Sequence, residues 1–155
     1  MDIIVKPIGY IESPFEEGDE NIPIQPGFSD AFGTVVVNSE FQEGLVDIDG
    51  FSHIILLYWF DKAFDEKLQV TPLLDDAPKG IFAIRHPNRP NKIGLSIVQL
   101  VKVDENKLLV KGVDVFNGTP LLDIKPFVPE FDTHGIEDTK IGWLEKKIRK
   151  KKDSD

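Results

Sequence analysis

The 155-residue sequence contains no cysteine. This absence excludes disulfide bonds, thiolate zinc sites, cysteine-ligated iron–sulfur clusters and a cysteine nucleophile. Long apolar runs are also missing, because the longest, from Ile54 to Phe60, is far shorter than the roughly 20 residues that span a bilayer. The first residues show no basic region followed by a long apolar stretch, which predicts no signal peptide. We therefore expect no membrane segment and a cytoplasmic location.

Several motifs that identify enzyme classes are missing too. The sequence has no GxGxxG after a predicted strand, no GxxxxGK[ST], no GxSxG and no HExxH. The three histidines, His53, His86 and His134, are not spaced like metal ligands, so we expect no metal site. His53 stands at the head of an apolar run, which predicts a core or boundary residue.

Charge is distributed unevenly along the chain. The net charge is −9, yet Lys146 to Lys152 holds six basic residues in seven positions. Residues 1–145 carry 12 basic and 25 acidic side chains, a net charge of −13. An acidic body repels a phosphate backbone, whereas the basic run attracts one. We favour the interpretation of the run as a solvated, frayed end, with phosphate binding as the alternative.

The pattern of apolar residues predicts a mostly β chain with long loops. Ser39 and Gln42 resemble a capping box that opens a short helix, and Ile141 to Leu144 predicts a second one. Strands do not alternate with helices, which favours an antiparallel barrel or sandwich. We expect one domain over residues 1–140, followed by a short helix and basic tail over residues 141–155. The predicted strands cover residues 3–12, 32–37, 53–60 (buried on both faces), 93–103, 107–113 and 119–124, with a further short apolar segment at 80–84.

The most polar segment between apolar strands covers residues 85–96. It holds three cations, two asparagines and two prolines. Prolines fix φ and lower the entropy cost of holding polar groups in place, and guanidinium groups bind carboxylates or phosphates with two parallel hydrogen bonds. The residues alone are equally compatible with a binding loop and with a surface turn whose charges are solvated.

A second polar segment covers residues 112–127. Its Asn117-Gly118 dipeptide is typical of a turn that adopts positive φ. Lys125 follows Asp123 on the same side of a predicted strand. Taken alone, these residues favour a hairpin with an Asp123–Lys125 ion pair and an asparagine that stabilises the turn.

Taken in order, five segments resemble the TrmO/TsaA-like family over about residues 8–130. RPNxIGxS followed by GTPxxDIKP is a specific combination, unlike a lone glycine motif. The resemblance implies a homodimeric β-barrel methyltransferase that uses S-adenosylmethionine. It further implies methylation of threonylcarbamoyladenosine next to the anticodon of tRNA. The segments are Ile8–Pro14, Gln25–Gly27, Gly50–His53, Arg85–Ser96 and Asp114–Pro126.

The resemblance also implies a cofactor pocket. Arg85 would hold the carboxylate of S-adenosylmethionine and Asp114 its ammonium or ribose. Asn117 would contact the adenine or a hydroxyl, and Leu95 and Phe116 would sandwich the adenine ring. Substrate contacts are expected at Arg89, Asn91 and Lys125, and no catalytic residue is assigned. The full cofactor set is Ile24, Gln25, Pro26, Asp61, Lys62, Arg85, Leu95, Asp114, Val115, Phe116 and Asn117.

The chain departs from the family pattern at several positions. Members that act on tRNA have Arg where this chain has Ile24, and a His-Gln pair where it has Asp61 and Lys62. Lys92 replaces the proline of RPNPIG, and the further C-terminal domain of those members has no counterpart beyond Trp143 and the basic run. Methylation of tRNA is the leading hypothesis. The alternatives are methylation of a small molecule or another RNA, and cofactor binding without turnover.

Overall fold

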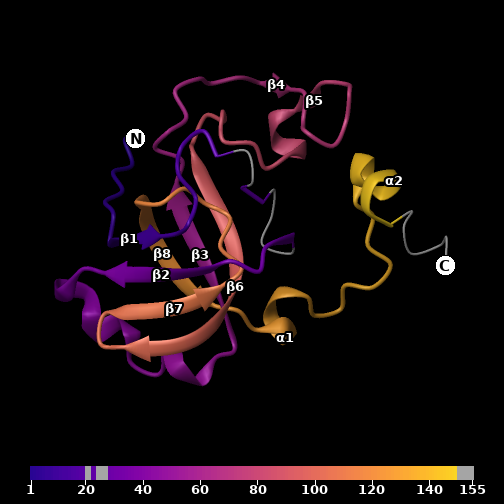
Figure 1. Cartoon of the computed structure of the whole chain (residues 1–155). Coiled ribbons are helices and arrows are strands. Elements are labelled where there is room, and N and C mark those ends of the chain that lie inside the picture. The colour runs from indigo at the N-terminus through magenta and orange to yellow at the C-terminus, as the bar shows by residue number, and fades with distance from the viewer. Residues whose placement is uncertain (20–21, 24–27, 150–155) are drawn as a thin grey trace.

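The computed structural model describes residues 1–19, 22–23 and 28–149. Six strands form a closed barrel in the order β1-β2-β7-β6-β3-β8, and every neighbouring pair is antiparallel. Figure 1 shows the barrel with a smaller two-stranded hairpin, β4 and β5, above it. The antiparallel barrel is thus confirmed. The strands are β1 (Gly9–Glu12), β2 (Phe32–Val37), β3 (His53–Trp59), β4 (Gln69–Val70), β5 (Lys79–Gly80), β6 (Ile93–Asp104), β7 (Lys107–Lys111) and β8 (Thr119–Pro126).

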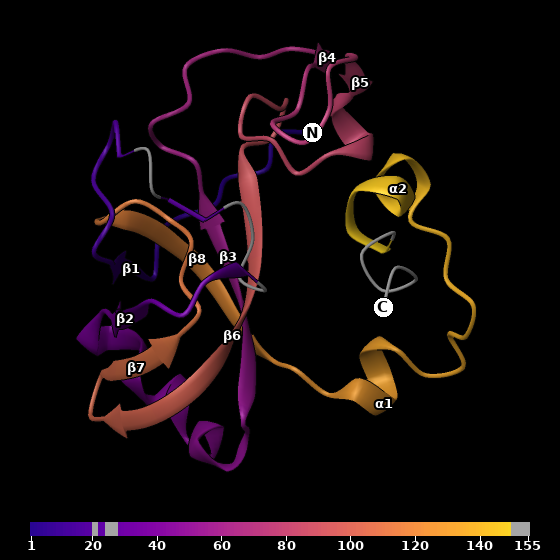
Figure 2. The same ribbon diagram turned by 45° about the vertical axis from the view of Figure 1, so that its right-hand side comes forward.

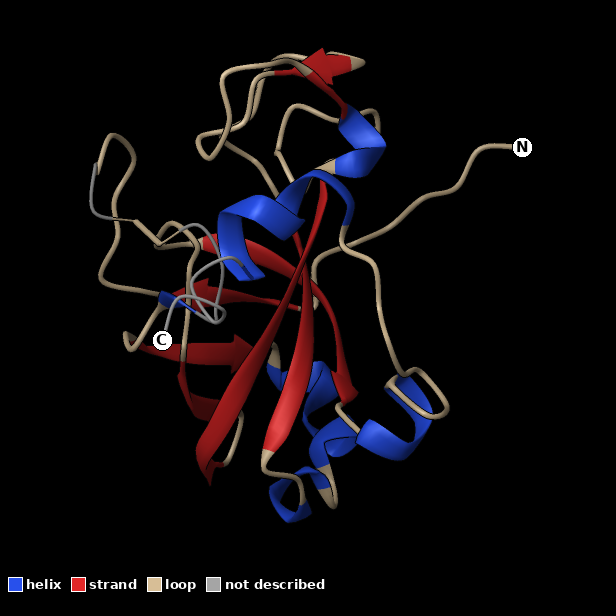
Figure 3. Cartoon of the chain, turned by 90° about the vertical axis from the view of Figure 1, so that its right-hand side faces the viewer, coloured by secondary structure: helices blue, strands red, loops and turns tan. Residues whose placement is uncertain are grey.

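Helices in the described residues are short and lie around the barrel (Figure 3). The predicted helices near Ser39 and Ile141 are confirmed, although the predicted capping box is wrong. Asn38 is the N-cap of the first helix, and no side chain bonds to its N-terminus. The 3-10 helices are η2 (Ser39–Leu45), η3 (Ile48–Gly50), η4 (Ile81–Ala83) and η5 (Gly142–Leu144), and the α-helices are α1 (Pro129–Asp132) and α2 (Glu145–Ile148).

Side chains that alternate along each strand fill the barrel interior. Because successive residues of a strand point to opposite faces, one face of each strand supplies the core. On β3 only every second residue is buried, so the prediction that this strand is buried on both faces is wrong. The buried members of the core are Ile11, Val35, Val37, Ile54, Leu56, Tyr58, Val98, Leu108, Val110, Val113, Val115 and Leu121.

The first predicted strand is shorter than expected. Residues 3–8 lie outside any strand, and Ile3, Ile4 and Val5 are exposed. Gly9 already pairs with Val37, the last residue of β2, so residues before Gly9 have no further β2 residue to pair with. Ile8 still bonds to the backbones of Leu121 and Asn38, whereas the β-branched residues 3–5 have strand propensity but no strand partner.

The antiparallel arrangement gives the barrel two distinct ends. At one end β1, β3 and β7 finish and β2, β6 and β8 begin, and we call it the loop end. It carries the connections 13–31, 60–92 and 112–118. At the opposite end, Phe41 and Ile48 pack against the core. The β6–β7 turn also lies there, with Glu105 at φ 55° between the strands predicted at residues 93–103 and 107–113.

Gly94 leaves room for an aromatic ring inside the barrel, which generates a prediction. Gly94 is the cross-strand partner of Tyr58, and a Cβ added to it would lie less than 3.0 Å from the rings of Tyr58 and Phe60. We expect Gly94→Ala to lower the free energy of unfolding by about 1–3 kcal/mol, because the packed rings have to move. Urea denaturation measures the change.

The matched control is Gly44→Ala in η2. A Cβ at Gly44 meets nothing within 4 Å, so this variant should unfold within about 0.5 kcal/mol of the parent chain. Equal stabilities of the two variants would contradict the packing argument for Gly94.

Candidate functional site

The connection 112–118 follows β7 and is held in place by the connection that follows β1. The Ser13 hydroxyl donates to the Val115 carbonyl at 2.5 Å, and the Ser29 hydroxyl donates to the Val113 carbonyl at 2.6 Å. The Asn117 N–H donates to the Phe15 carbonyl at 2.6 Å. These three hydrogen bonds fix the backbone of a segment that would otherwise be a free loop.

The turn that ends this segment needs a glycine. Gly118 has φ +84°, a conformation that residues with a Cβ rarely adopt, which confirms the predicted positive φ. The buried Thr119 hydroxyl donates to the Phe116 carbonyl at 2.6 Å and closes the turn. The Asn117 side chain accepts from the Ser13 N–H at 3.1 Å and donates to Glu16 at 3.2 Å. Its expected contact with adenine stays a prediction.

A chain of hydrogen bonds leads from the barrel interior to Asp114. The Ser96 hydroxyl donates to the Asp114 carboxylate at 2.7 Å, and the Tyr58 hydroxyl lies 2.8 Å from the Ser96 oxygen. A serine hydroxyl has one proton, so Tyr58 is the donor to Ser96. Tyr58 and Ser96 are 3% and 2% exposed, so their positions are set by core packing. The carboxylate of Asp114 is therefore oriented by two buried residues.

Burial makes the charge of Asp114 costly. Removal from water raises the pKa of Asp114 to about 6, although the Ser96 hydrogen bond and the positive charge of Arg85 act in the opposite direction. Burial and the charge of Asp114 raise the pKa of Tyr58, and Arg85 again opposes this shift. Arg85 is thus close enough to act on both groups. The loop end holds a guanidinium beside a partly buried carboxylate that is ionised at neutral pH.

Residues 85–92 of the connection 60–92 are held in place by hydrogen bonds from two of their own cationic side chains. The Arg89 guanidinium donates to the carbonyls of Ile84 at 2.9 Å and His86 at 3.2 Å. The Lys92 ammonium donates to the carbonyls of Asp65 at 2.6 Å and Arg89 at 3.2 Å. Burial, together with the charges of Lys67 and Arg89, lowers the pKa of His86, so its ring is neutral at pH 7. Arg89 and Lys92 stabilise the loop that carries Arg85.

Other predicted residues also lie at the loop end. Asp61 and Lys62 are exposed directly after β3, and Phe60 before them donates its N–H to the Lys92 carbonyl at 2.8 Å. Asn91 is exposed just before β6. Ile24, Gln25 and Pro26 lie outside the described residues.

Two predicted residues lie apart from Asp114. Leu95 is 41% exposed on the outer face of β6, the opposite face from Ser96, so its expected place opposite Phe116 stays a prediction. Lys125 pairs across the sheet with Ile55, near the start of β3, and its ammonium lies 2.9 Å from the carboxylate of Asp123. This ion pair is the one that the sequence predicted for a structural hairpin.

Sequence reasoning missed Tyr58 and Ser96 as site residues. Tyr58 belongs to the apolar run from Ile54 to Phe60, so the sequence pattern predicts a core ring and assigns no role to its hydroxyl. Ser96 could have been predicted, because it is the one serine among the inward-facing apolar positions of β6. A buried hydroxyl needs a hydrogen-bond partner, which points to a polar group nearby.

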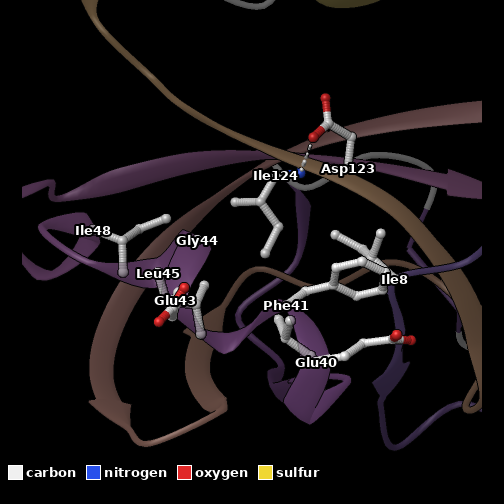
Figure 4. A pocket seen from close by; sticks show the side chains of 10 residues that line it. Ile8, Glu40, Phe41, Glu43, Gly44, Leu45, Ile48, Asp123 and Ile124 are labelled. Atoms are coloured by element: carbon white, nitrogen blue, oxygen red, sulfur yellow. Dashed lines mark hydrogen bonds between the residues drawn. The ribbon is translucent and has the colours of Figure 1, made fainter.

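A separate hollow lies at the opposite end of the barrel (Figure 4). It has a volume of about 390 Å³ and an apolar lining that includes Ile8, Phe41 and Ile124, with Glu40, Glu43 and Asp123 also at its surface. One Asp123 oxygen accepts from the Ile124 N–H at 2.9 Å. None of the predicted cofactor residues lines this hollow.

The described residues form neither a metal-binding cluster nor a membrane-spanning helix. No group of three histidine, aspartate or glutamate side chains in residues 1–19, 22–23 and 28–149 is arranged to hold a metal ion. No helix in that part of the chain has the length and apolar character needed to cross a membrane.

The loop end combines groups that suit a zwitterionic ligand. A guanidinium binds a carboxylate through charge-assisted hydrogen bonds, and a carboxylate such as that of Asp114 binds an ammonium. The half-buried ring of Phe116, two positions after Asp114 in the same connection, offers an apolar surface. An amino-acid group attached to an aromatic base fits this donor set.

Comparisons with known proteins agree with this chemistry. A Pyrococcus abyssi protein named as a probable S-adenosyl-L-methionine-binding protein is 51% identical over 149 residues, which cover 96% of this chain and 79% of that protein. A human tRNA (adenine(37)-N6)-methyltransferase is 33% identical over 141 residues, covering 85% of this chain and 32% of that enzyme.

A solved structure has the same fold. A crystal structure of TrmO from Pseudomonas aeruginosa superimposes with a TM-score of 0.75 at 37% identity, and the match covers 92% of this chain and 63% of that one. The chain therefore spans less than two thirds of the solved protein. Residues 10–133 match the family described as the tRNA-methyltransferase O N-terminal domain. A match over that much of the sequence shows that the chain belongs to this family.

Proposed function

We propose that this protein binds S-adenosylmethionine at the loop end and methylates N6 of an adenosine in tRNA. The observation that carries the proposal is the Asp114 carboxylate, oriented by Ser96 and Tyr58 and acted on by the positive charge of Arg85, in a chain of this family. Relatives named as S-adenosyl-L-methionine-binding proteins and as tRNA methyltransferases support it. The resemblance further suggests threonylcarbamoyladenosine as the acceptor, and a tRNA substrate implies a cytoplasmic location.

The donor set fits the cofactor. Arg85 would bind its carboxylate, Asp114 its ammonium and Phe116 the adenine. Leu95 lies on the outer face of β6, so a contact with the adenine would have to come from that face. Bound S-adenosylmethionine supplies a methyl group that its sulfonium already activates, so the transfer depends mainly on alignment. The protein supplies that alignment, because Tyr58 and Ser96 hold the Asp114 carboxylate in one orientation before any ligand binds.

Residues at the loop end would receive the RNA. Arg89 and Asn91 are the proposed substrate contacts next to Arg85, since they lie in the same connection. Lys125 also belongs to the proposed set, although its ion pair with Asp123 would have to exchange for a phosphate. Asp61 and Lys62 replace residues typical of members that act on tRNA, so the acceptor needs a direct assay.

We infer that the protein forms a homodimer through the outer face of β3 and β6. Ile93, Leu95 and Ile97 are 44%, 41% and 38% exposed on alternate positions of β6. Their cross-strand partners Trp59, Leu57 and Ile55 are half-buried on the same face. A continuous apolar strip on one sheet face is typical of a protein–protein contact.

The proposed function is tested by methyl transfer. With methyl-labelled cofactor, we expect the label to enter tRNA that contains threonylcarbamoyladenosine and not the unmodified tRNA. Mass spectrometry of the digested nucleosides identifies the product. Label in a small-molecule extract alone would favour the small-molecule alternative, and cofactor binding without transfer would favour the binding module.

Arg85→Ala should weaken cofactor binding more than tenfold. A lost charge-assisted hydrogen bond costs about 1.5–3 kcal/mol. Lys107→Ala, an exposed cation at the opposite end of the barrel, serves as the control and should bind as the parent chain does. Isothermal calorimetry measures both, and equal affinities of the two variants would remove Arg85 from the site.

A second prediction concerns Asp114, whose folded-state pKa lies above its ordinary value. The folded protein then binds a proton more tightly than the unfolded chain, so this group's contribution to stability falls as pH rises from about 4 to about 6. Asp114→Asn removes that cost. We expect the variant to be more stable than the parent by about 1–3 kcal/mol at pH 7.5, and equally stable below pH 4.

Cofactor binding should change in the opposite direction. Asp114→Asn should bind S-adenosylmethionine at least tenfold more weakly at pH 7.5, because the ammonium loses its counter-charge. Asp123→Asn is the control, since that carboxylate is 45% exposed and should leave both quantities nearly unchanged. A stability difference that does not depend on pH would contradict the raised pKa.

The dimer is tested with Ile97→Lys. A charge in the middle of the apolar strip should produce a monomer, because burial of an unpaired ammonium in the dimer contact has a large free-energy cost. Sedimentation equilibrium measures the mass. Val46→Lys, an exposed apolar position after η2, should leave the mass unchanged. A monomeric parent chain at high micromolar concentration would contradict the inference.

A further inference from the structure

The C-terminal segment is attached to the rest of the protein rather than frayed. The Trp143 indole N–H donates to the Ala83 carbonyl at 2.8 Å, across 60 positions of sequence. The Lys79 ammonium lies 5.7 Å from the centre of the Trp143 ring. Figure 2 shows α2 beside the segment that contains β5 and η4. Up to Arg149, the interpretation of the basic run as a frayed end is therefore wrong, and residues 150–155 lie outside the described residues.

Asp75 forms a second attachment point. Its carboxylate lies 3.0 Å from the ammonium of Lys79 and 3.9 Å from that of Lys147. The hydrogen bond from Lys79 lowers the pKa of Asp75, so the group is ionised at neutral pH. Arg149 closes the segment on itself, with its guanidinium 2.6 Å from the Thr139 hydroxyl. The segment thus has an aromatic and an ionic contact with the 69–83 region.

This docking brings residues 146–149 next to the connection that carries Arg85. Ala83, which accepts the Trp143 hydrogen bond, is two residues before Arg85. Residues 61–92 carry six basic and five acidic side chains, whereas the rest of residues 1–145 carries six basic and 20 acidic ones. The described C-terminal bases therefore adjoin a part of the chain whose charge is nearly balanced, where an RNA backbone meets less repulsion than beside a strongly acidic segment.

We propose that the C-terminal segment is an RNA-binding arm. In this proposal Trp143 and Asp75 hold Lys146 and Arg149 beside the Arg85 loop, where they contact phosphates of the RNA. Each contact releases condensed counterions, and an arm that is already ordered loses less conformational entropy on binding than a free tail. The proposal rests on the proposed function, because it concerns the RNA that enters that site.

The first test asks whether RNA binding depends on where the basic residues of the arm are held, and not only on their charge. Trp143→Ala leaves every charge in place but removes the attachment, so we expect about tenfold weaker tRNA binding and a shallower dependence of affinity on salt. Cofactor affinity should stay unchanged. Phe131→Ala is the matched control, because that ring is 83% exposed and belongs to α1. It should bind tRNA as the parent chain does.

The second test uses Asp75→Asn, which removes a negative charge near the arm. If the arm acted by charge alone, this variant would bind tRNA more tightly, whereas loss of the Lys147 contact should weaken binding. Fluorescence anisotropy with tRNA between 50 and 300 mM salt, about the range over which phosphate contacts change affinity strongly, measures both variants.

Any one of the following outcomes would overturn the proposal. They are unchanged tRNA affinity and salt dependence in Trp143→Ala, tighter tRNA binding by Asp75→Asn, and a parent chain that does not bind tRNA at low salt. Equal losses of cofactor and tRNA binding in Trp143→Ala would also overturn it, since they would indicate a structural role. Failure of the proposed function is seen separately, as absent cofactor binding or methyl transfer by the parent chain.

Discussion

The candidate site depends on one constraint, the alternating direction of strands in a closed antiparallel barrel. Because each strand runs opposite to its neighbours, the connections after β1, β3 and β7 leave the barrel at the same end (Figure 1). Arg85 lies in the second of these connections and Asp114 in the third. Residues that are far apart in sequence therefore meet without a dedicated domain, and the closed sheet keeps them in register.

The barrel interior also sets the chemistry of the site. Ser96 and Tyr58 belong to the core, yet their hydroxyl groups form the chain that ends at Asp114. The same burial that orients the carboxylate raises its pKa, so folding stability is reduced in order to keep a charge in this place. Sites that bind charged ligands commonly carry such a cost, because the ligand later supplies the counter-charge.

The acidic and the basic parts of the chain affect RNA binding in opposite directions. The acidic body disfavours contact with a polyanion over most of its surface, while the segment 61–92 and the C-terminal arm are closer to neutral or basic. Attachment of the arm through Trp143 joins these two regions. The proposed RNA would thus be directed to the loop end by repulsion elsewhere as well as by attraction there.

Local sequence was enough to predict much of the fold. Alternation along 93–103 and 107–113, with a short polar turn between them, identified β6 and β7, because the period of two is a property of the strand itself. The turn at Asn117-Gly118 followed from the conformational freedom of glycine. The cofactor residues were predicted through the resemblance to a known family, since spacing alone left the 85–96 segment open.

Only the tertiary structure decided the rest. Residues 3–5 have strand propensity but no strand partner, and Ser39 is not the N-cap because the helix begins one residue earlier, with Asn38 in that position. The bond between Ser96 and Asp114 and the docking of Trp143 on Ala83 depend on contacts across 18 and 60 positions of sequence, which local patterns do not encode. The sequence by itself determined which segments are strands and which residues carry charge. Closure of the barrel decided which of those charges meet, because only the pairing of distant strands brings their ends together.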